Sequence, residues 1–356
     1  MTKIIKISER NINFGKIKEA AKEIKKGRLV IFPTETVYGI GANAFDPKAC
    51  REIFRVKKRA ADNPLIVHIS GFKQLDDVAY VNEETVNKLK KLWPGPITFV
   101  LKKKKVPDVV TAGLDTVAVR MPNNKIALAL ISESGTPIAA PSANISTFPS
   151  STEAKHALAD FNGKVSVIID GGKSEFGIES TVIDISRKPY RLLRPGAFDV
   201  ADISKIMGKI IIPKNINRPI KKGKPLSPGM KYRHYSPRKP LFLFNDINNM
   251  KKAYKFLLRK KVKFTVISPI EYSRYFKKTK TINLGSIKES KSISRNLFSA
   301  FRKLDEIDAE FGLISKIRLK SFDLAVRNRM EKAAGENQIK DMKSFFEAFD
   351  YYKDKY

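Results

Sequence analysis

Short apolar segments alternate with amphipathic helical segments over the first 207 residues, and this alternation constrains the fold more than any other feature. A chain that repeats strand and helix in this way builds an α/β domain. Because the strands follow one another closely, we expect a mixed sheet and not a purely parallel one. The predicted helices include 16–27 and 46–56, and the predicted strands are 28–32, 64–69, 97–102, 117–121, 137–140, 165–170, 180–185 and 190–193.

Residues 208–238 interrupt this alternation with several prolines and glycines and many charges, a composition typical of an extended linker. From residue 239 onward the alternation returns. It gives strands at 240–244, 263–268, 281–285 and 310–315 and helices at 246–260, 292–307 and 323–335. We therefore predict a first α/β domain over 1–207, a linker over 208–238, and a smaller α/β domain with a parallel sheet over 239–356.

The chain is strongly basic, with 69 Lys and Arg against 36 Asp and Glu and a net charge of +33. Such a charge attracts nucleic acids, nucleotides and other anions, although diffuse lysine is also typical of a solvated surface.

A single cysteine, Cys50, excludes an intramolecular disulfide framework and a cysteine metal cluster. The sequence has no apolar membrane span and no signal-peptide core. We expect a soluble, cytoplasmic protein.

Arg120 lies in the apolar strand segment "VAVRM", where an unpaired guanidinium would be costly to bury. The sequence therefore predicts an anionic partner for Arg120. Thr116 precedes it by four residues, so both side chains are expected on the same face of the strand.

Other cations stand at the ends of predicted elements, namely Lys57, Arg59 and Arg194, and hydroxyl side chains accompany them. This combination favours a triphosphate site. A cation at a helix C-terminus is also favourable without any ligand, which is the alternative for Lys57 and Arg59. Likewise, His68 at a strand end fits a core histidine bonded to a backbone carbonyl. No P-loop motif is present.

Seven segments occur in the order found in the YrdC-like family, which this chain therefore resembles: "FPTETVYGIGANA", "KKRAADNPLIVHI", "WPGPITFVL", "TAGLDTVAVRMP", "IAAPSANIS", "GIESTVIDI" and "LLRPGA". The segments "LSPGMKYRHYSP" and "AVRNRMEKAAG" are similar to those of two-domain family members. The resemblance implies a twisted mixed-sheet domain with a basic concave surface and a smaller Rossmann-like α/β domain.

The resemblance also implies a reaction in which L-threonine, bicarbonate and ATP, with Mg²⁺, give threonylcarbamoyl-adenylate and pyrophosphate. The product would serve a partner complex that modifies an adenosine beside the anticodon of certain tRNAs. We assign no protein side chain to the metal. By the same resemblance, the linker is expected to cover the active site and protect the labile product from water.

The resemblance assigns roles by position. On the L-threonine side it implies Thr34, His68, Arg120, Ala140 and Ser180, with Arg120 suited to the substrate carboxylate. On the ATP side it implies Lys57, Arg59, Asn63, Thr116, Ser142, Asn144, Ser150, Arg194, Tyr232 and His234. Lys57, Arg59 and Arg120 are the implied catalytic residues.

Two residues depart from the family pattern, which usually reads Lys-Gly-Arg-Pro. Here Lys58 and Ala60 replace the glycine and the proline. Lys58 either adds a phosphate contact or points to solvent. The alternative function is a double-stranded RNA or tRNA binding module without catalysis, which the basic charge also suits.

Overall fold

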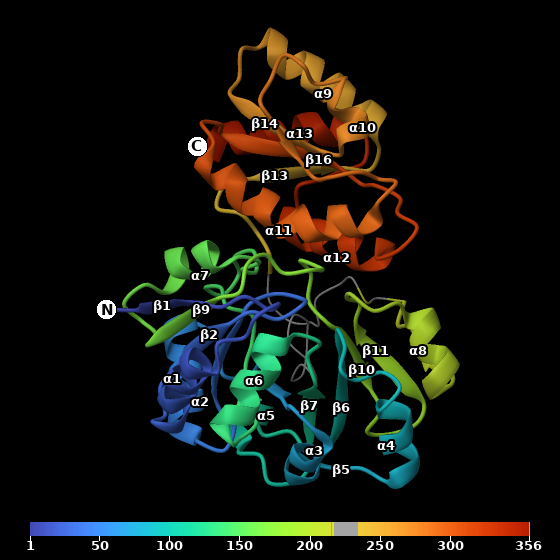
Figure 1. Cartoon of the computed structure of the whole chain (residues 1–356). Helices are drawn as coiled ribbons and strands as arrows, with labels where there is room; N and C mark the ends of the chain where they lie inside the picture. The colour runs from blue at the N-terminus through green and yellow to red at the C-terminus, as the bar shows by residue number, and fades with distance from the viewer. Residues whose placement is uncertain (215, 217–233, 356) are drawn as a thin grey trace. The chain divides into compact units, whose positions relative to one another are not determined.

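The computed structural model describes residues 1–214, 216 and 234–355. The chain divides into two units (Figure 1): Met1–Ser146 with Ser150–Tyr232, and Thr147–Pro149 with Arg233–Tyr356. Tyr232 and most of the predicted linker lie outside the described residues. Within the described ranges, no helix has the length and apolar character needed to cross a membrane.

The first unit is built on a sheet to which twelve strands of the described residues contribute. The strands lie in the order β1-β9-β2-β3-β8-β4-β7-β6-β10-β11-β12, and β5 pairs with β6. Parallel pairs such as β4 with β7 and antiparallel pairs such as β7 with β6 occur side by side, which confirms the predicted mixed sheet. The strands are β1 (Lys3–Lys6), β2 (Val30–Phe32), β3 (Gly39–Asn43), β4 (Ile66–His68), β5 (Ala79–Tyr80), β6 (Ile97–Lys103), β7 (Thr116–Arg120), β8 (Ile138–Ala139), β9 (Val167–Asp170), β10 (Thr181–Asp184), β11 (Tyr190–Arg194) and β12 (Ile210–Ile211).

The eight strands predicted in this region are present, with shorter bounds at most ends. Three further strands escaped prediction: β1, β3 and the two-residue β5. Strand β3 reads Gly-Ile-Gly-Ala-Asn, and its small residues give no strand propensity. Residues 210–211, which we placed in the linker, form β12 and pair with β11.

Helices cover the sheet of the first unit, and α1 and α6 pack against each other on it (Figure 1). Asn13 caps α1, and Asp46 followed by Pro47 starts α2, as the Asp-Pro pair predicted. Helix α2 ends at Lys58, which adopts the left-handed conformation. The helices are α1 (Phe14–Lys25), α2 (Pro47–Lys57), α3 (Phe72–Val78), α4 (Glu83–Leu89), α5 (Asp108–Thr111), α6 (Lys125–Ser134), α7 (Ala154–Phe161) and α8 (Val200–Met207).

The second unit contains a parallel sheet in the order β15-β14-β16-β13-β17, as the sequence predicted. Figure 1 shows α9 and α13 on one face of this sheet and α11 and α12 on the other, the arrangement of a Rossmann-like fold. Its elements are β13 (Leu241–Phe244), α9 (Ile247–Arg259), β14 (Phe264–Ser268), α10 (Ile270–Ser273), β15 (Thr281–Asn283), α11 (Ser290–Glu306), β16 (Phe311–Ser315), α12 (Asp323–Ala334), β17 (Gln338–Ile339) and α13 (Met342–Lys355).

Residues 147–149 belong to the second unit, although they lie between strands of the first in sequence. Arg302 of α11 donates from Nε and Nη2 to the Pro149 carbonyl, at 3.1 and 2.7 Å. The amide of Ser236 donates to the Thr147 carbonyl at 2.9 Å. Backbone groups of 147–149 are thereby held within the second unit.

Gly196 lies against the backbone that enters β10. A Cβ atom at this position would come within 2.3 Å of Ser180 C and Thr181 N, which are backbone atoms that cannot rotate away. The chain after β11 therefore approaches β10 closely only because residue 196 has no side chain.

We expect Gly196→Ala to lower the free energy of unfolding by about 1–3 kcal/mol, because the added methyl overpacks this contact. Urea unfolding followed by circular dichroism measures the loss. Gly71→Ala is the control, since a Cβ there meets nothing within 4 Å. Equal effects of the two substitutions would contradict the packing argument.

His68 ends β4 in the interior of the first unit, with Nδ1 3.1 Å from the Ile66 carbonyl. Burial, and next the nearby Arg120 guanidinium, lower the pKa of His68 to about 3. The histidine of an unfolded chain has a pKa near 6.5. Between these two values the unfolded state binds a proton that the folded state does not, so the free energy of unfolding falls as the pH is lowered.

We expect His68→Gln to remove this sensitivity to acid. Between pH 7 and pH 5, the wild type should lose on the order of 2 kcal/mol more unfolding free energy than the variant. Urea midpoints measured across that range provide the comparison. Parallel pH profiles for the two proteins would show that His68 does not titrate in this way.

Candidate active site

The segment 33–38, between β2 and β3, is a buried turn rich in polar side chains. The Thr34 hydroxyl accepts from the amides of Thr36 and Val37 and donates to the Val37 carbonyl at 2.6 Å. It also lies 2.9 Å from the Thr36 hydroxyl. The predicted threonine contact Thr34 is thus engaged within its own turn.

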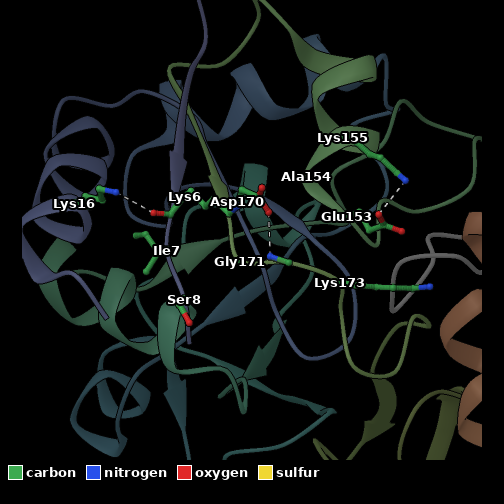
Figure 2. Close-up of a pocket in the computed structure, with 11 residues that line it drawn as sticks. Lys6, Ile7, Ser8, Lys16, Glu153, Ala154, Lys155, Asp170, Gly171 and Lys173 are labelled. Carbon is green, nitrogen blue, oxygen red and sulfur yellow. Dashed lines mark hydrogen bonds and ion pairs between the residues drawn. The ribbon is translucent and has the colours of Figure 1, made fainter. Parts of the chain in front are cut away.

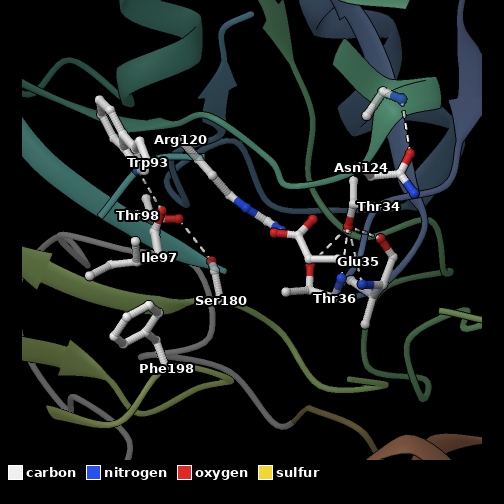
Figure 3. A network of polar contacts seen from close by, with 12 residues as sticks. Thr34, Glu35, Thr36, Trp93, Ile97, Thr98, Arg120, Asn124, Ser180 and Phe198 are labelled. Atoms are coloured by element: carbon white, nitrogen blue, oxygen red, sulfur yellow. Dashed lines mark hydrogen bonds and ion pairs between the residues drawn. The ribbon is translucent and has the colours of Figure 1, made fainter. Parts of the chain in front are cut away.

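Arg120, at the end of β7, forms a buried ion pair with Glu35 of this turn (Figure 3). Arg120 Nη2 lies 2.7 Å from Glu35 Oε1, and the two side chains are only 4% and 2% exposed. The predicted anionic partner of Arg120 is therefore confirmed, and it comes from a residue 85 positions earlier in the chain. His68 is paired with Arg120 in the sheet register and is neutral beside it.

Strands β6, β10 and β11 contribute a second polar cluster. It lies near the Arg120 end of β7, because β6 runs antiparallel to β7 and so begins where β7 ends. The hydroxyls of Thr98 and Ser180 lie 2.8 Å apart. Arg194, at the end of β11, donates to the Ser180 carbonyl and, at 3.1 Å, to its hydroxyl. Ser180 and Arg194 are thus brought together.

Lys57 is hydrogen bonded to two other candidates, Ser142 and Asn144, on the other side of the turn. It is 1% exposed, and its ammonium donates to the carbonyls of Ser142, at 2.5 Å, and Asn144. The Ser142 hydroxyl in turn donates to Asn144 Oδ1 at 2.6 Å. The structure therefore brings Lys57, Ser142 and Asn144 together, with the loop 142–144 folded around the lysine.

Arg59 and Asn63 belong to the segment that joins α2 to β4. Arg59 donates to the carbonyls of Asn63 and Pro64, both at 3.0 Å, and holds this segment closed. Asn63 is buried, whereas Lys58 and Ala60 are exposed. Of the two alternatives for Lys58, the structure favours the solvent-facing one.

The turn 33–38 joins the two groups of candidates. Glu35 contacts Arg120 on one side, and on the other the Ala143 amide donates to the Tyr38 carbonyl at 2.7 Å. The Tyr38 amide donates to the Ser151 carbonyl at 2.8 Å. The turn therefore fixes the position of both groups.

Two further candidates are buried near these groups. Ser150 is fully buried and donates to Glu179 Oε1 at 2.7 Å. The amide of Ala140 donates to the Ile66 carbonyl at 2.9 Å, which ties β8 to β4.

Three candidates are not assigned to either group. Thr116 begins the strand that Arg120 ends, so about 13 Å of extended chain separates them. His234 belongs to the second unit, where its ring lies 5.6 Å from that of Tyr235. Tyr232 lies outside the described residues. The roles implied for these three residues stay predictions.

A separate open pocket of about 750 Å³ lies in the first unit (Figure 2). The lysines Lys6, Lys16, Lys155 and Lys173 line it together with Asp170 and Glu153. No candidate site residue lines this pocket, so it is distinct from the groups around the turn.

Sequence reasoning assigned no role to Glu35 or Thr98, which the structure places beside Arg120 and Ser180. The need of Arg120 for an anion was visible, but its partner is distant in sequence and only the fold identifies it. Thr98 stands inside an apolar strand segment and gave no signal of its own.

The chain is similar to known proteins over nearly its whole length. A family model described as "Telomere recombination" matches residues 22–196, and one described as "Threonylcarbamoyl-AMP synthase, C-terminal domain" matches residues 198–335. The threonylcarbamoyl-AMP synthase of Pyrococcus abyssi is 45% identical over 352 residues, which is 96% of this chain and 100% of the relative. The Bacillus subtilis protein of the same name is 38% identical over 93% of this chain and 96% of the relative.

A solved structure of P. abyssi Sua5 complexed with L-threonine superposes with a TM-score of 0.87 at 44% identity, covering 95% of this chain and 99% of the other. Identity at this level over nearly the whole of both chains, together with both family models, confirms the resemblance seen in the motifs. The chain belongs to the threonylcarbamoyl-AMP synthase family.

Proposed function

We propose that this chain condenses L-threonine, bicarbonate and ATP to threonylcarbamoyl-AMP and pyrophosphate. The observation that carries the proposal is the position of the turn 33–38. Through Glu35 it contacts Arg120, and through Tyr38 it is hydrogen bonded to the loop 142–144 that Lys57 holds. The side chains around Arg120 suit a small amino acid, and those around Lys57 suit phosphates. The named relatives and the threonine-bound structure support the same reaction.

On the amino-acid side, Arg120 would bind the substrate carboxylate, because a planar guanidinium can donate two parallel hydrogen bonds to it. Ser180, fixed by Arg194 and Thr98, would present its hydroxyl to the substrate. His68 is neutral in the folded protein, so it would line the site as a polar side chain without adding a charge.

On the nucleotide side, Lys57 would act with the loop 142–144 that it holds, together with Arg59. The reaction needs no strong general base, because amines form carbamates readily in the presence of dissolved carbon dioxide. The harder task is to hold the carbamate against the α-phosphorus of ATP, and fixed cations and hydrogen-bond donors reduce the repulsion between the two anions.

Mg²⁺ is expected to enter with ATP, as part of the same proposal. In the described ranges, no group of three or more His, Cys, Asp or Glu side chains is arranged to hold a metal ion. A magnesium ion carried on a triphosphate needs few protein ligands, so these residues are compatible with it. When bound, the ion would neutralise phosphate charge.

The product is an activated carbamoyl group and requires an acceptor. We propose that a tRNA-modifying complex receives it, which the basic charge of the chain suits. The alternative, an RNA-binding module without catalysis, is the weaker one because the relatives that match almost the whole chain are named as synthases.

Pyrophosphate release tests the reaction directly. We expect release from ATP and Mg²⁺ that requires L-threonine and bicarbonate together and is slower with L-serine. Salt-sensitive RNA binding without such release would favour the non-catalytic alternative.

Arg120→Lys should raise the KM for L-threonine at least tenfold, because lysine keeps the charge beside Glu35 but loses the planar pair of donors (roughly 1.4 kcal/mol per factor of ten). Lysine is preferable to alanine, which would leave Glu35 buried and unpaired at a cost of about 3–5 kcal/mol. The KM for ATP should change much less. An unchanged KM for L-threonine would argue against this site.

Lys57→Met should raise the KM for ATP by about 10- to 100-fold, because it removes two charge-assisted hydrogen bonds that hold the loop 142–144. The matched control is Lys58→Asn, a change of the neighbouring exposed lysine to a residue that tolerates its left-handed backbone. The KM for ATP of each variant is measured by pyrophosphate release at saturating L-threonine. If the two variants bind ATP alike, Lys57 does not serve the nucleotide side.

A further inference from the structure

Glu35 is a buried carboxylate, and within the described residues its oxygens accept none of the hydrogen bonds that such a group normally accepts. Neither Oε1 nor Oε2 accepts a hydrogen bond from any described residue, and on Arg120 neither Nε nor Nη2 donates one. The two side chains lie 2.7 Å apart but are joined by charge alone, without a well-aligned hydrogen bond (Figure 3).

The neighbouring polar groups of the described residues do not supply the missing hydrogen bonds. The Thr34 hydroxyl donates to the Val37 carbonyl and lies against the Thr36 hydroxyl. His68 lies with Nδ1 on the Ile66 carbonyl. A buried ion pair whose remaining donors and acceptors are unmatched costs free energy relative to an apolar pair, so its presence requires an explanation.

A bound α-amino acid supplies that explanation. Its ammonium and carboxylate are attached to the same carbon, so a receptor must place an anion and a cation side by side. Glu35 and Arg120 do so at 2.7 Å. The ammonium has three donors for the Glu35 oxygens, and the carboxylate has acceptors for the Arg120 nitrogens.

We infer that Glu35 is the residue that binds the substrate ammonium, and that Glu35 and Arg120 together form a receptor for a zwitterion. The inference rests on the proposed function, because L-threonine is the substrate there. With His68 neutral, the two charges of this receptor cancel. The site therefore matches a neutral amino acid and rejects an acid that has no amine, which would leave Glu35 buried without a cation.

Isothermal titration with two ligands tests the inference. The first ligand is L-threonine, and the second is the 2,3-dihydroxybutanoate of the same configuration, in which a hydroxyl replaces the amine. We expect the wild type to bind L-threonine at least roughly 100-fold more tightly. In Glu35→Gln, this ratio should fall to about tenfold or less, chiefly because L-threonine binds more weakly.

The ratio of the two dissociation constants separates recognition from a structural role. If Glu35 only supported Arg120, Glu35→Gln would weaken both ligands equally and leave the ratio unchanged, and this result would overturn the inference. The control is Asp184→Asn, which neutralises another buried carboxylate, one that accepts from the Ser186 amide and hydroxyl. The control should keep the ratio of the wild type.

If Glu35→Gln fails to fold, Glu35→Asp provides the same comparison, because the shorter side chain withdraws the carboxylate from the ammonium and should also lower the ratio. A wild type that binds both ligands equally would overturn the inference while leaving the proposed function intact. A wild type that binds no L-threonine and releases no pyrophosphate would overturn the proposed function and the inference with it.

Discussion

The ion pair between Glu35 and Arg120 is the interaction on which the rest of the site depends. It is almost completely buried, and it joins the end of β7 to the turn that follows β2. Removing either partner would leave a charge in the interior, so the pair fixes the turn as firmly as it fixes the arginine. Burial, and next the Arg120 guanidinium, lower the pKa of His68 and keep that histidine neutral.

The turn 33–38 also connects this ion pair to the loop 142–144. Through Tyr38 it is hydrogen bonded to Ala143, which lies within the loop 142–144 that Lys57 holds by two carbonyls, and to Ser151. Cations in this protein therefore serve two purposes. Arg194 and Lys57 donate to backbone carbonyls around them, whereas Nε and Nη2 of Arg120 donate to no described residue, and we propose that they serve a ligand.

Local pattern was enough to predict much of the fold, and non-local contacts explain what it missed. The apolar strands and the start of α2, with Asp46 as its cap and Pro47 as its first residue, are short-range features, so they could be predicted from the sequence. Strand β3 is specified by its neighbours and not by its own small residues. The site shows the same division. The need of Arg120 for an anion was evident, but Glu35 became its partner only once β2 and β7 were placed.

The fate of the bicarbonate carbon tests the proposed condensation most directly. The purified chain would be incubated with ATP, Mg²⁺, L-threonine and ¹³C-labelled bicarbonate, and the adenylates would be examined by mass spectrometry. We expect an adenylate that contains threonine and one labelled carbon, formed only when all substrates are present. An adenylate of threonine itself without the label, or no adenylate at all, would contradict the proposed condensation.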